Sequence, residues 1–127
     1  MTSQHYKNID EHTPVLVGIA AVNQRFETAG EGKEAYQLMV DALEAAASDA
    51  GSRELLTGAD EIQVPKGTWS YTNPAQLLAD EIGAEHAQKV LVEIGVLQQT
   101  LFSRACKQIA DGSCDIVLIA GGESKYR

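Results

Sequence analysis

The sequence predicts an α/β protein with three layers, in which a mainly parallel sheet lies between helices. Short apolar runs rich in β-branched residues alternate along the chain with longer segments whose apolar residues recur at helical spacing. Successive strands joined by a helix run parallel through right-handed connections, and this places helices on the faces of the sheet. Residues 116–120 add a third indication, because five apolar residues between turn signals are typical of a strand buried on both faces.

The amino-terminal half is expected to supply two strands and a helix. The first strand covers residues 15–21, an apolar run that follows a proline. A polar loop then leads to a helix over residues 33–50, whose apolar side chains share one face. Gly51 suits the position after that helix, since glycine adopts a left-handed backbone at little steric cost. After a short polar connection, residues 61–64 form a second, shorter strand.

The second helix is marked at both of its ends. Asn73 can accept a free amide proton as the capping residue, Pro74 fits the first helical position, and Gly83 ends the helix. A third strand over residues 90–94 and a third helix over residues 96–110 follow, ahead of the strand at 116–120.

Composition limits the classes of protein to which the chain can belong. Its 127 residues fit one domain, which we place at residues 13–127, and the 44% hydrophobic fraction argues against disorder. A net charge of -8 disfavours nucleic acid and anionic membranes as partners. No apolar run approaches the roughly 20 residues that span a bilayer. Residues 1–12 form a polar leader that we expect to be disordered, without the apolar core of a secretory signal, so a cytoplasmic location is expected.

The cysteines and histidines form no recognisable site. Cys106 and Cys114 are not spaced as a metal-binding pair, and Cys106 is expected to be a buried structural thiol on the third helix. His5 and His12 belong to the leader and His86 to a polar turn, so none is expected to act as a ligand or base. We therefore expect no metal and no resident cofactor.

Motifs for common cofactors are missing from the sequence. No glycine-rich dinucleotide motif follows the first strand, and neither a phosphate-binding loop nor a serine nucleophile elbow is present. The pair Gly121 and Gly122 follows the last strand. It can be interpreted as a tight turn or as a phosphate cradle, and we prefer the turn.

The order of these segments resembles the amino-terminal half of a thiolase. Asn73-Pro74-Ala75 opens a helix, a strand and a second helix follow around Gly95, and residues 112–124 read Gly-Ser-Cys-Asp-Ile-Val-Leu-Ile-Ala-Gly-Gly-Glu-Ser. The resemblance spans about residues 14–124, and ketoacyl synthases, which share the fold, match less well. It implies a thiolase-like half-domain with strand order 3-2-1-4, incomplete relative to the family.

The resemblance also implies a reaction, for which this chain lacks a central group. Thiolases transfer acyl groups between acyl-CoA thioesters, in lipid metabolism, through a cysteine thiolate at the start of the third helix. Gly95 occupies that expected position, and Cys106 lies eleven residues further along, about 16 Å away on a helix. The remaining catalytic groups come from the carboxyl-terminal half in the family. We therefore expect no catalytic residue in this chain.

Three hypotheses for function remain open. In the first, the chain is a thiolase-like domain related to acetyl-CoA acetyltransferases but unable to form an acyl-enzyme. In the second, it is a non-catalytic acyl-CoA-binding or interaction module, or one subunit of a split thiolase-like complex. In the third, it is an unrelated flavodoxin-like or response-regulator-like domain. The last fits poorly, since Ala21 and Val22 follow the first strand where paired acidic residues are needed. The expected partners are acyl-CoA and either a second copy of the chain or a missing carboxyl-terminal half. We expect the protein contact near residues 116–120 and the third helix, because an exposed apolar strand edge is normally covered.

Overall fold

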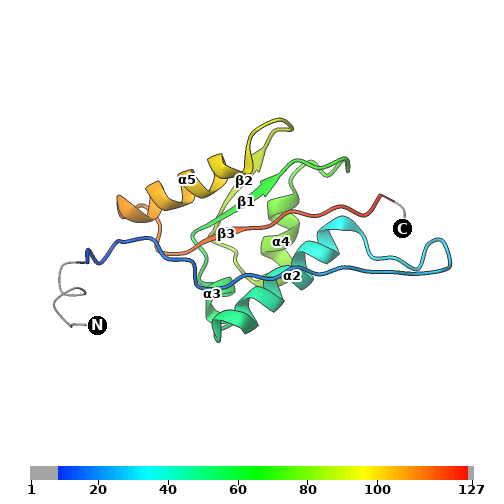
Figure 1. The fold of residues 1–127 in the computed structure, drawn as a ribbon, viewed down its shortest axis with the longest axis horizontal. Helices are drawn as coiled ribbons and strands as arrows, with labels where there is room; N and C mark the ends of the chain where they lie inside the picture. Colours follow the sequence, from blue (N-terminus) through cyan, green and yellow to red (C-terminus); the bar gives the residue numbers. More distant parts are fainter. Residues whose placement is uncertain (1–8, 126–127) are drawn as a thin grey trace.

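The computed structural model describes residues 9–125 and shows three layers, with a parallel sheet between helices (Figure 1). Helix α5 covers one face of the sheet, and α4 and α2 lie on the other. The predicted α/β/α class is therefore confirmed. Their bounds are α2 Ala35–Ala50, α3 Glu54–Thr57, β1 Glu61–Pro65, α4 Pro74–Ile82, β2 Gln88–Val92, α5 Gln98–Ala110 and β3 Val117–Ile119.

The sheet has three strands in the order β2-β1-β3, all parallel. Glu61 of β1 lies opposite Gln88 of β2 and Val117 of β3. The Asp60 carboxylate fixes the start of β3, because its Oδ2 accepts the amide protons of Asp115 and Ile116 at 2.8 and 3.0 Å. Strands β1 and β3 are thus direct neighbours. The predicted order 3-2-1-4 is wrong, since no strand is inserted between them.

The predicted first strand, residues 15–21, lies outside the sheet as an extended segment running along α2 (Figure 1). Gly18 packs so closely on this helix that an added Cβ would lie 2.4 Å from the Ala46 carbonyl oxygen. The Ile19 amide donates to Asp49 Oδ2 at 3.0 Å. The apolar run was correctly expected to be extended, but a strand also needs a paired neighbour, and β3 occupies the place beside β1.

Local capping signals set the ends of the helices largely as predicted. Gly51 ends α2 with φ 88°, and Gly83 ends α4 with φ 80°. The Asn73 side chain accepts the Gln76 amide at 3.3 Å, and Pro74 is the first residue of α4. Helix α2 starts two residues later than expected, because Glu34 and Gln37 form a reciprocal capping box there.

Two further differences concern short segments. Helix α5 starts at Gln98, two residues after the predicted start. The connection after α2 contains the one-turn helix α3, which buries Leu56 in the core. Of the predicted leader, residues 1–8 lie outside the described residues, and residues 10–13 form a turn in which the Thr13 amide donates to the Asp10 carbonyl oxygen.

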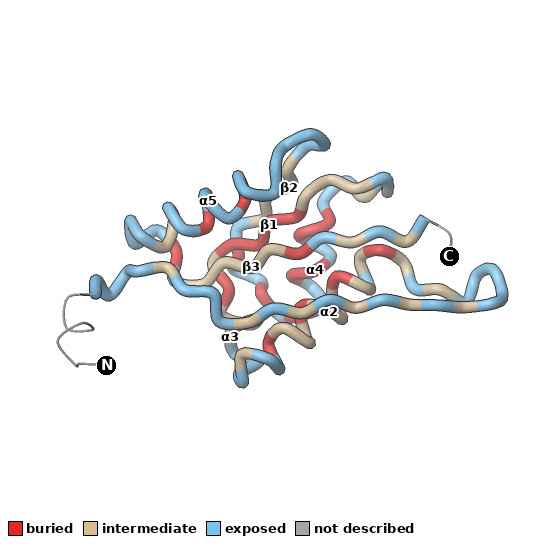
Figure 2. Tube along the Cα trace, viewed as in Figure 1, coloured by how far each residue is buried: buried red, intermediate tan, exposed pale blue. Residues whose placement is uncertain are grey.

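The core lies between the sheet and the α2/α4 layer, as the buried residues in Figure 2 show. Alternate residues of β1 supply its sheet side, while α2 and α4 supply the helical side. The largest buried apolar side chains there are Met39, Leu56, Ile62, Val64, Leu78 and Ile82. No helix in the described part of the chain combines the length and apolar character needed to cross a bilayer.

The opposite face of β1 carries two polar side chains that are completely buried. Glu61 and Gln63 are both buried, and Glu61 contacts α5, whose own buried residues are Leu101 and Ala105. Arg104 of α5 donates to both carboxylate oxygens of Glu61, at 2.9 and 3.3 Å. The Gln63 amide nitrogen donates to the same carboxylate at 2.8 Å. A buried charge is tolerated only when it is paired in this way, so Arg104 fixes α5 on the sheet.

Loss of this pairing should destabilise the protein. We expect Arg104→Met to lower the free energy of unfolding by about 2 to 3 kcal/mol, because the carboxylate of Glu61 stays buried without its cation. Urea unfolding followed by circular dichroism measures this change. Arg53→Met is the matched control, since Arg53 makes the same bidentate contact with the partly exposed Glu44, and its loss should change the midpoint little. Equal effects of the two variants would contradict the structural role of Glu61.

Candidate functional site

The candidate site is the edge of the sheet where the three parallel strands end. In α/β folds, ligands bind beyond the carboxyl ends of the strands, because the loops that follow the strands converge there. Three loops do so in this chain: residues 66–73 after β1, residues 93–97 after β2 and residues 120–125 after β3.

Hydrogen bonds made by the side chains of Trp69 and Glu123 join the loops after β1 and β3. The Trp69 indole N–H donates to the Gly122 carbonyl oxygen at 2.9 Å. The Glu123 carboxylate accepts the Thr68 amide at 2.6 Å. Lys66 folds back over the Trp69 ring, with its ammonium 4.6 Å from the ring centroid and donating to the Trp69 carbonyl oxygen. These contacts make one side of the edge a fixed wall that carries the ammonium of Lys66 and the carboxylate of Glu123.

An aromatic stack connects this wall to the amino-terminal end of α2. The Trp69 and Tyr71 rings are stacked with centroids 5.2 Å apart and an interplanar angle of 27°. Tyr36 of α2 meets Tyr71 edge to face at 5.6 Å. Each such pair adds on the order of 1 kcal/mol beyond its area burial. The stack therefore holds the β1 loop against α2.

The glycine pair after β3 forms part of the same wall and continues in an extended backbone. The described backbone has no turn or bend at Gly121 and Gly122, and neither has a positive φ, so the interpretation as a tight turn is wrong. Their small size serves close packing. A Cβ on Gly121 would lie 3.1 Å from the Pro65 ring, and one on Gly122 would lie 3.2 Å from Cγ of Met39.

The loop after β2 contrasts with this wall because it is exposed along its length. Gly95 adopts φ 97°, and nothing lies within 4 Å of where its Cβ would be. Leu97 precedes α5 and offers no side-chain cap to the first turn. Ile94 and Leu97 are 68% and 74% exposed. The start of α5, the expected nucleophile position at Gly95 included, thus presents backbone amides and aliphatic side chains.

Neither cysteine lies at this edge. Cys106 is exposed in α5, about 12 Å along the helix from its first residue, so the prediction that it is buried is wrong. It is next to the buried Ala105 in the sequence, and one residue turns the side chain by about 100° to the outer face. Cys114 is the buried thiol, beyond the far end of α5. Burial raises its pKa, and the negative charges of Glu61 and Asp60 raise it further.

The histidines are dispersed. His12 and His86 are exposed in turns, and His5 lies outside the described residues. Within residues 9–125, no three or more His, Cys, Asp and Glu side chains gather closely enough to hold a metal ion.

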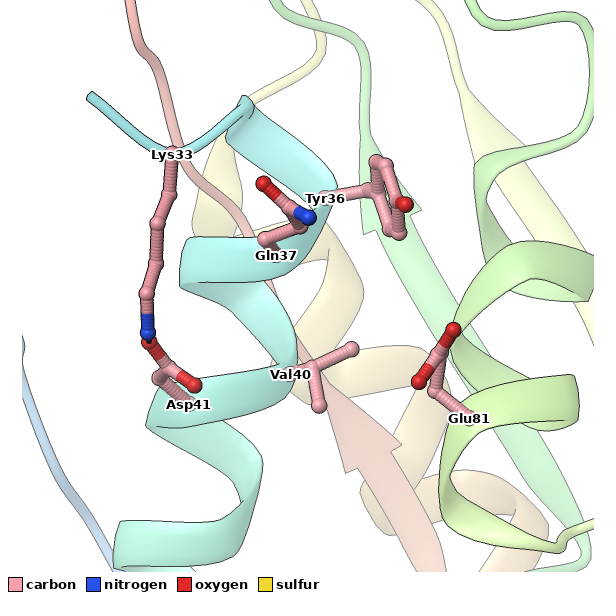
Figure 3. Close-up of a pocket in the computed structure, with 6 residues that line it drawn as sticks. All are labelled: Lys33, Tyr36, Gln37, Val40, Asp41 and Glu81. Carbon is pink, nitrogen blue, oxygen red and sulfur yellow. Dashed lines mark hydrogen bonds and ion pairs between the residues drawn. The ribbon is translucent and has the colours of Figure 1, made fainter. Parts of the chain in front are cut away.

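A surface hollow lies between α2 and α4 (Figure 3). It is open and measures about 210 Å³. On one side of the hollow Lys33 forms an ion pair with Asp41 at 2.5 Å, and on the other side Glu81 lies on α4. It is lined by Lys33, Tyr36, Gln37, Val40, Asp41 and Glu81. These charges are already paired or solvated, so the hollow adds no reactive group.

Sequence reasoning missed the Trp69 wall. Trp69 and Gly122 are 53 residues apart, and no local pattern reports such a contact. One signal was present, namely the chain's single tryptophan, which follows the second strand beside Lys66 and Tyr71. A tryptophan in a loop beyond a central strand often marks a contact surface.

Comparison with known proteins supports a thiolase-like fold. No family model matches the chain, and no curated protein matches its sequence. Ten chains of solved structures match, among them the crystal structure of a monomeric SCP2-thiolase like protein type 1 from Mycobacterium smegmatis. The TM-score is 0.68 and the sequence identity 25%, over 91% of this chain and 24% of that chain. The chain thus spans about a quarter of that protein's length, and it has a thiolase-like fold.

The two cysteines should react differently with iodoacetamide. In the Cys106→Ser variant, which leaves Cys114, alkylation should be slow and should accelerate only above the pH at which an ordinary thiol ionises, since the raised pKa keeps the thiol protonated. The Cys114→Ser variant, which leaves the exposed Cys106, should react at least about tenfold faster at pH 8. Mass spectrometry over a pH series measures both rates. Fast stoichiometric alkylation of either thiol at pH 6 would show an activated cysteine and contradict this assignment.

Proposed function

We propose that this chain is a thiolase-like domain, related to acetyl-CoA acetyltransferases, that binds acyl-CoA thioesters in the cytoplasm without forming an acyl-enzyme itself. The observation that carries the proposal is the geometry of the sheet edge in a fold that matches an SCP2-thiolase-like protein. The helix that starts at this edge is preceded by Gly95, which has no side chain to attack a thioester.

The start of α5 suits the thioester carbonyl. The first amides of a helix have no partner within it, and the helix dipole favours negative charge there. No side chain caps α5, and the Thr100 amide already donates to the Leu97 carbonyl oxygen, so the amides of Gln98 and Gln99 are the ones that can receive a carbonyl oxygen. The exposed aliphatic side chains of Ile94, Val96 and Leu97 offer apolar contact to an acyl chain at the same place.

One cation for the anionic part of coenzyme A is available locally, in the wall that also holds the Glu123 carboxylate. Lys66 brings its ammonium to the wall formed by Trp69 and Gly122. The proposal therefore has the acyl end near α5 and a phosphate near Lys66.

Covalent catalysis by this chain would need a nucleophile within bonding reach of the same carbonyl. Cys106 lies about 12 Å along the helix from its first residue, and Cys114 lies beyond the opposite end. Positioning alone does not replace a covalent nucleophile, so we propose that acyl transfer, where it occurs, uses groups outside this chain.

The second candidate is an interaction module, or one subunit of a split thiolase-like complex. The observation in its favour is the outer face of α5, where Phe102 is 47% exposed and Cys106 is exposed beside it. A missing carboxyl-terminal half, or another subunit, is the proposed partner for that face.

Acyl-CoA binding can be followed through the single tryptophan. We expect acetoacetyl-CoA to change Trp69 fluorescence with a dissociation constant on the order of 1 mM or tighter, while thiolysis and condensation stay at the buffer background. Lys66→Ala should weaken binding about fivefold through loss of one phosphate contact. Lys107→Ala, on exposed α5 away from the edge, is the control and should not.

The outcomes separate the two candidates. Absence of binding at millimolar acetoacetyl-CoA would reject the acyl-CoA proposal and leave the interaction module. Acetylation of either cysteine, seen by mass spectrometry after incubation with acetyl-CoA, would show instead that the chain forms an acyl-enzyme.

A further inference from the structure

The extended segment before α2 runs beside the part of the chain that contains β3, and in the same direction (Figure 1). Two contacts place it there. A Cβ on Gly112 would lie 3.9 Å from the His12 ring, and the Gln24 side chain donates to the Ser124 hydroxyl at 3.0 Å. The members of each pair differ by 100 in residue number. The two stretches are therefore parallel, and residues 17–20, which we call the strap, lie beside residues 117–120.

Strand β3 has one edge without a partner strand, because it is the last strand in the order β2-β1-β3. The residues that flank it show which of its backbone groups face β1. The Ile116 carbonyl oxygen and the Ala120 amide both form hydrogen bonds to β1 or to the residue before it. Backbone groups of successive residues point to opposite edges of a strand. Val117 and Ile119 therefore direct their N–H and C=O groups to the open edge.

The strap also has backbone groups that are not in use. The Ile19 amide donates to the carboxylate of Asp49, on the exposed side of α2, at 3.0 Å. By the same alternation, the amides of Gly18 and Ala20 point to the opposite edge of the strap. Within residues 9–125, no backbone hydrogen bond joins the strap to β3. The strap thus lies beside the open edge without being bonded to it.

The register set by the two contacts matches these free groups. With Gly18 beside Leu118, a parallel ladder bonds Gly18 to Val117 and to Ile119, which are the residues whose backbone groups face the open edge. The side chains agree with this register. Gly18 packs on α2, and Leu118 packs against the core on the same side of the sheet. A shift by one residue would turn the strap over and lose both agreements.

Closure of the strap would also bury its exposed apolar side chains. Val17 and Ile19 are 55% and 70% exposed, and they lie on the face of the strap away from α2. In the same register they come beside Val117 and Ile119, whose side chains are only partly buried. Pairs of β-branched side chains on neighbouring strands stabilise a sheet.

We infer that the strap closes on the open edge of β3 as a fourth parallel strand and withholds this edge from protein partners. This is not the place that the sequence predicted for the first strand, between β1 and β3, since those two strands pair directly. A free strand edge is a template for another chain, and here a segment of the same chain covers it. The protein contact expected near residues 116–120 then requires the strap to open. The inference does not depend on acyl-CoA binding.

Amide hydrogen exchange followed by NMR on the full chain tests the closure. The amides of Gly18, Ala20 and Ile119 are the donors in the proposed ladder. After correction for intrinsic rates, we expect them to exchange at least about tenfold more slowly than the amides of Val17 and Ala21, which point away from β3. Exchange of all five amides at one rate would overturn the inference.

Two proline variants separate the ladder from the packing of the segment. Ala20→Pro removes an amide that donates to β3 in the ladder, whereas the control Ala21→Pro removes one that points away. We expect Ala20→Pro to speed exchange of the Ile119 amide about tenfold, and to cause concentration-dependent association in sedimentation velocity because the edge is open. Ala21→Pro should change neither, and circular dichroism checks that both variants are folded.

The outcomes test both parts of the inference. Equal effects of the two prolines on the Ile119 amide would contradict the ladder. Faster exchange in Ala20→Pro without any increase in association over the unchanged protein would reject the withholding of the edge.

Discussion

The rest of the structure depends on one buried carboxylate in the central strand. Glu61 is fully buried in β1, between β2 and β3 and beneath α5. The bidentate contact from Arg104 makes this burial tolerable. It also holds α5 on the sheet, where the helix buries only the small apolar surface of Leu101 and Ala105. Because α5 starts at the edge where the loops converge, the position of its amino-terminal amides follows from a charge pair near the middle of the helix.

Local signals in the sequence predicted the ends of the helices. They could not predict which segments form the sheet, because strand pairing depends on contacts between residues far apart in the sequence. The cap at Asn73 and the left-handed glycines act within a few residues, so they can be read from a short window. Residues 15–21 have the composition of a buried strand, yet the Asp60 carboxylate directs the start of β3 to the place beside β1. A hydrophobic run specifies an extended backbone. Which strand it pairs with is decided by contacts distant in the sequence.

The candidate site was predictable in place but not in composition. Parallel strands put the site at their carboxyl ends, and the position of Gly95 before α5 followed from the spacing of strand and helix. The wall was not predictable, because the bond between Trp69 and Gly122 joins residues from two different loops. The glycine pair was misread for a related reason: a glycine can serve a turn or a close approach, and only the neighbours Pro65 and Met39 distinguish these uses.

The sheet edge therefore combines a fixed side with an open side. The loops after β1 and β3 are joined through Trp69 and braced on α2 by the stack with Tyr71, whereas the loop after β2 touches little. In an acyl-transfer site, the fixed side is where a ligand can be oriented with small entropic cost, and the open side is where a reacting group must be positioned. This chain supplies the first, and at the expected nucleophile position of the second it has Gly95. Binding without covalent chemistry is what this division of rigidity favours.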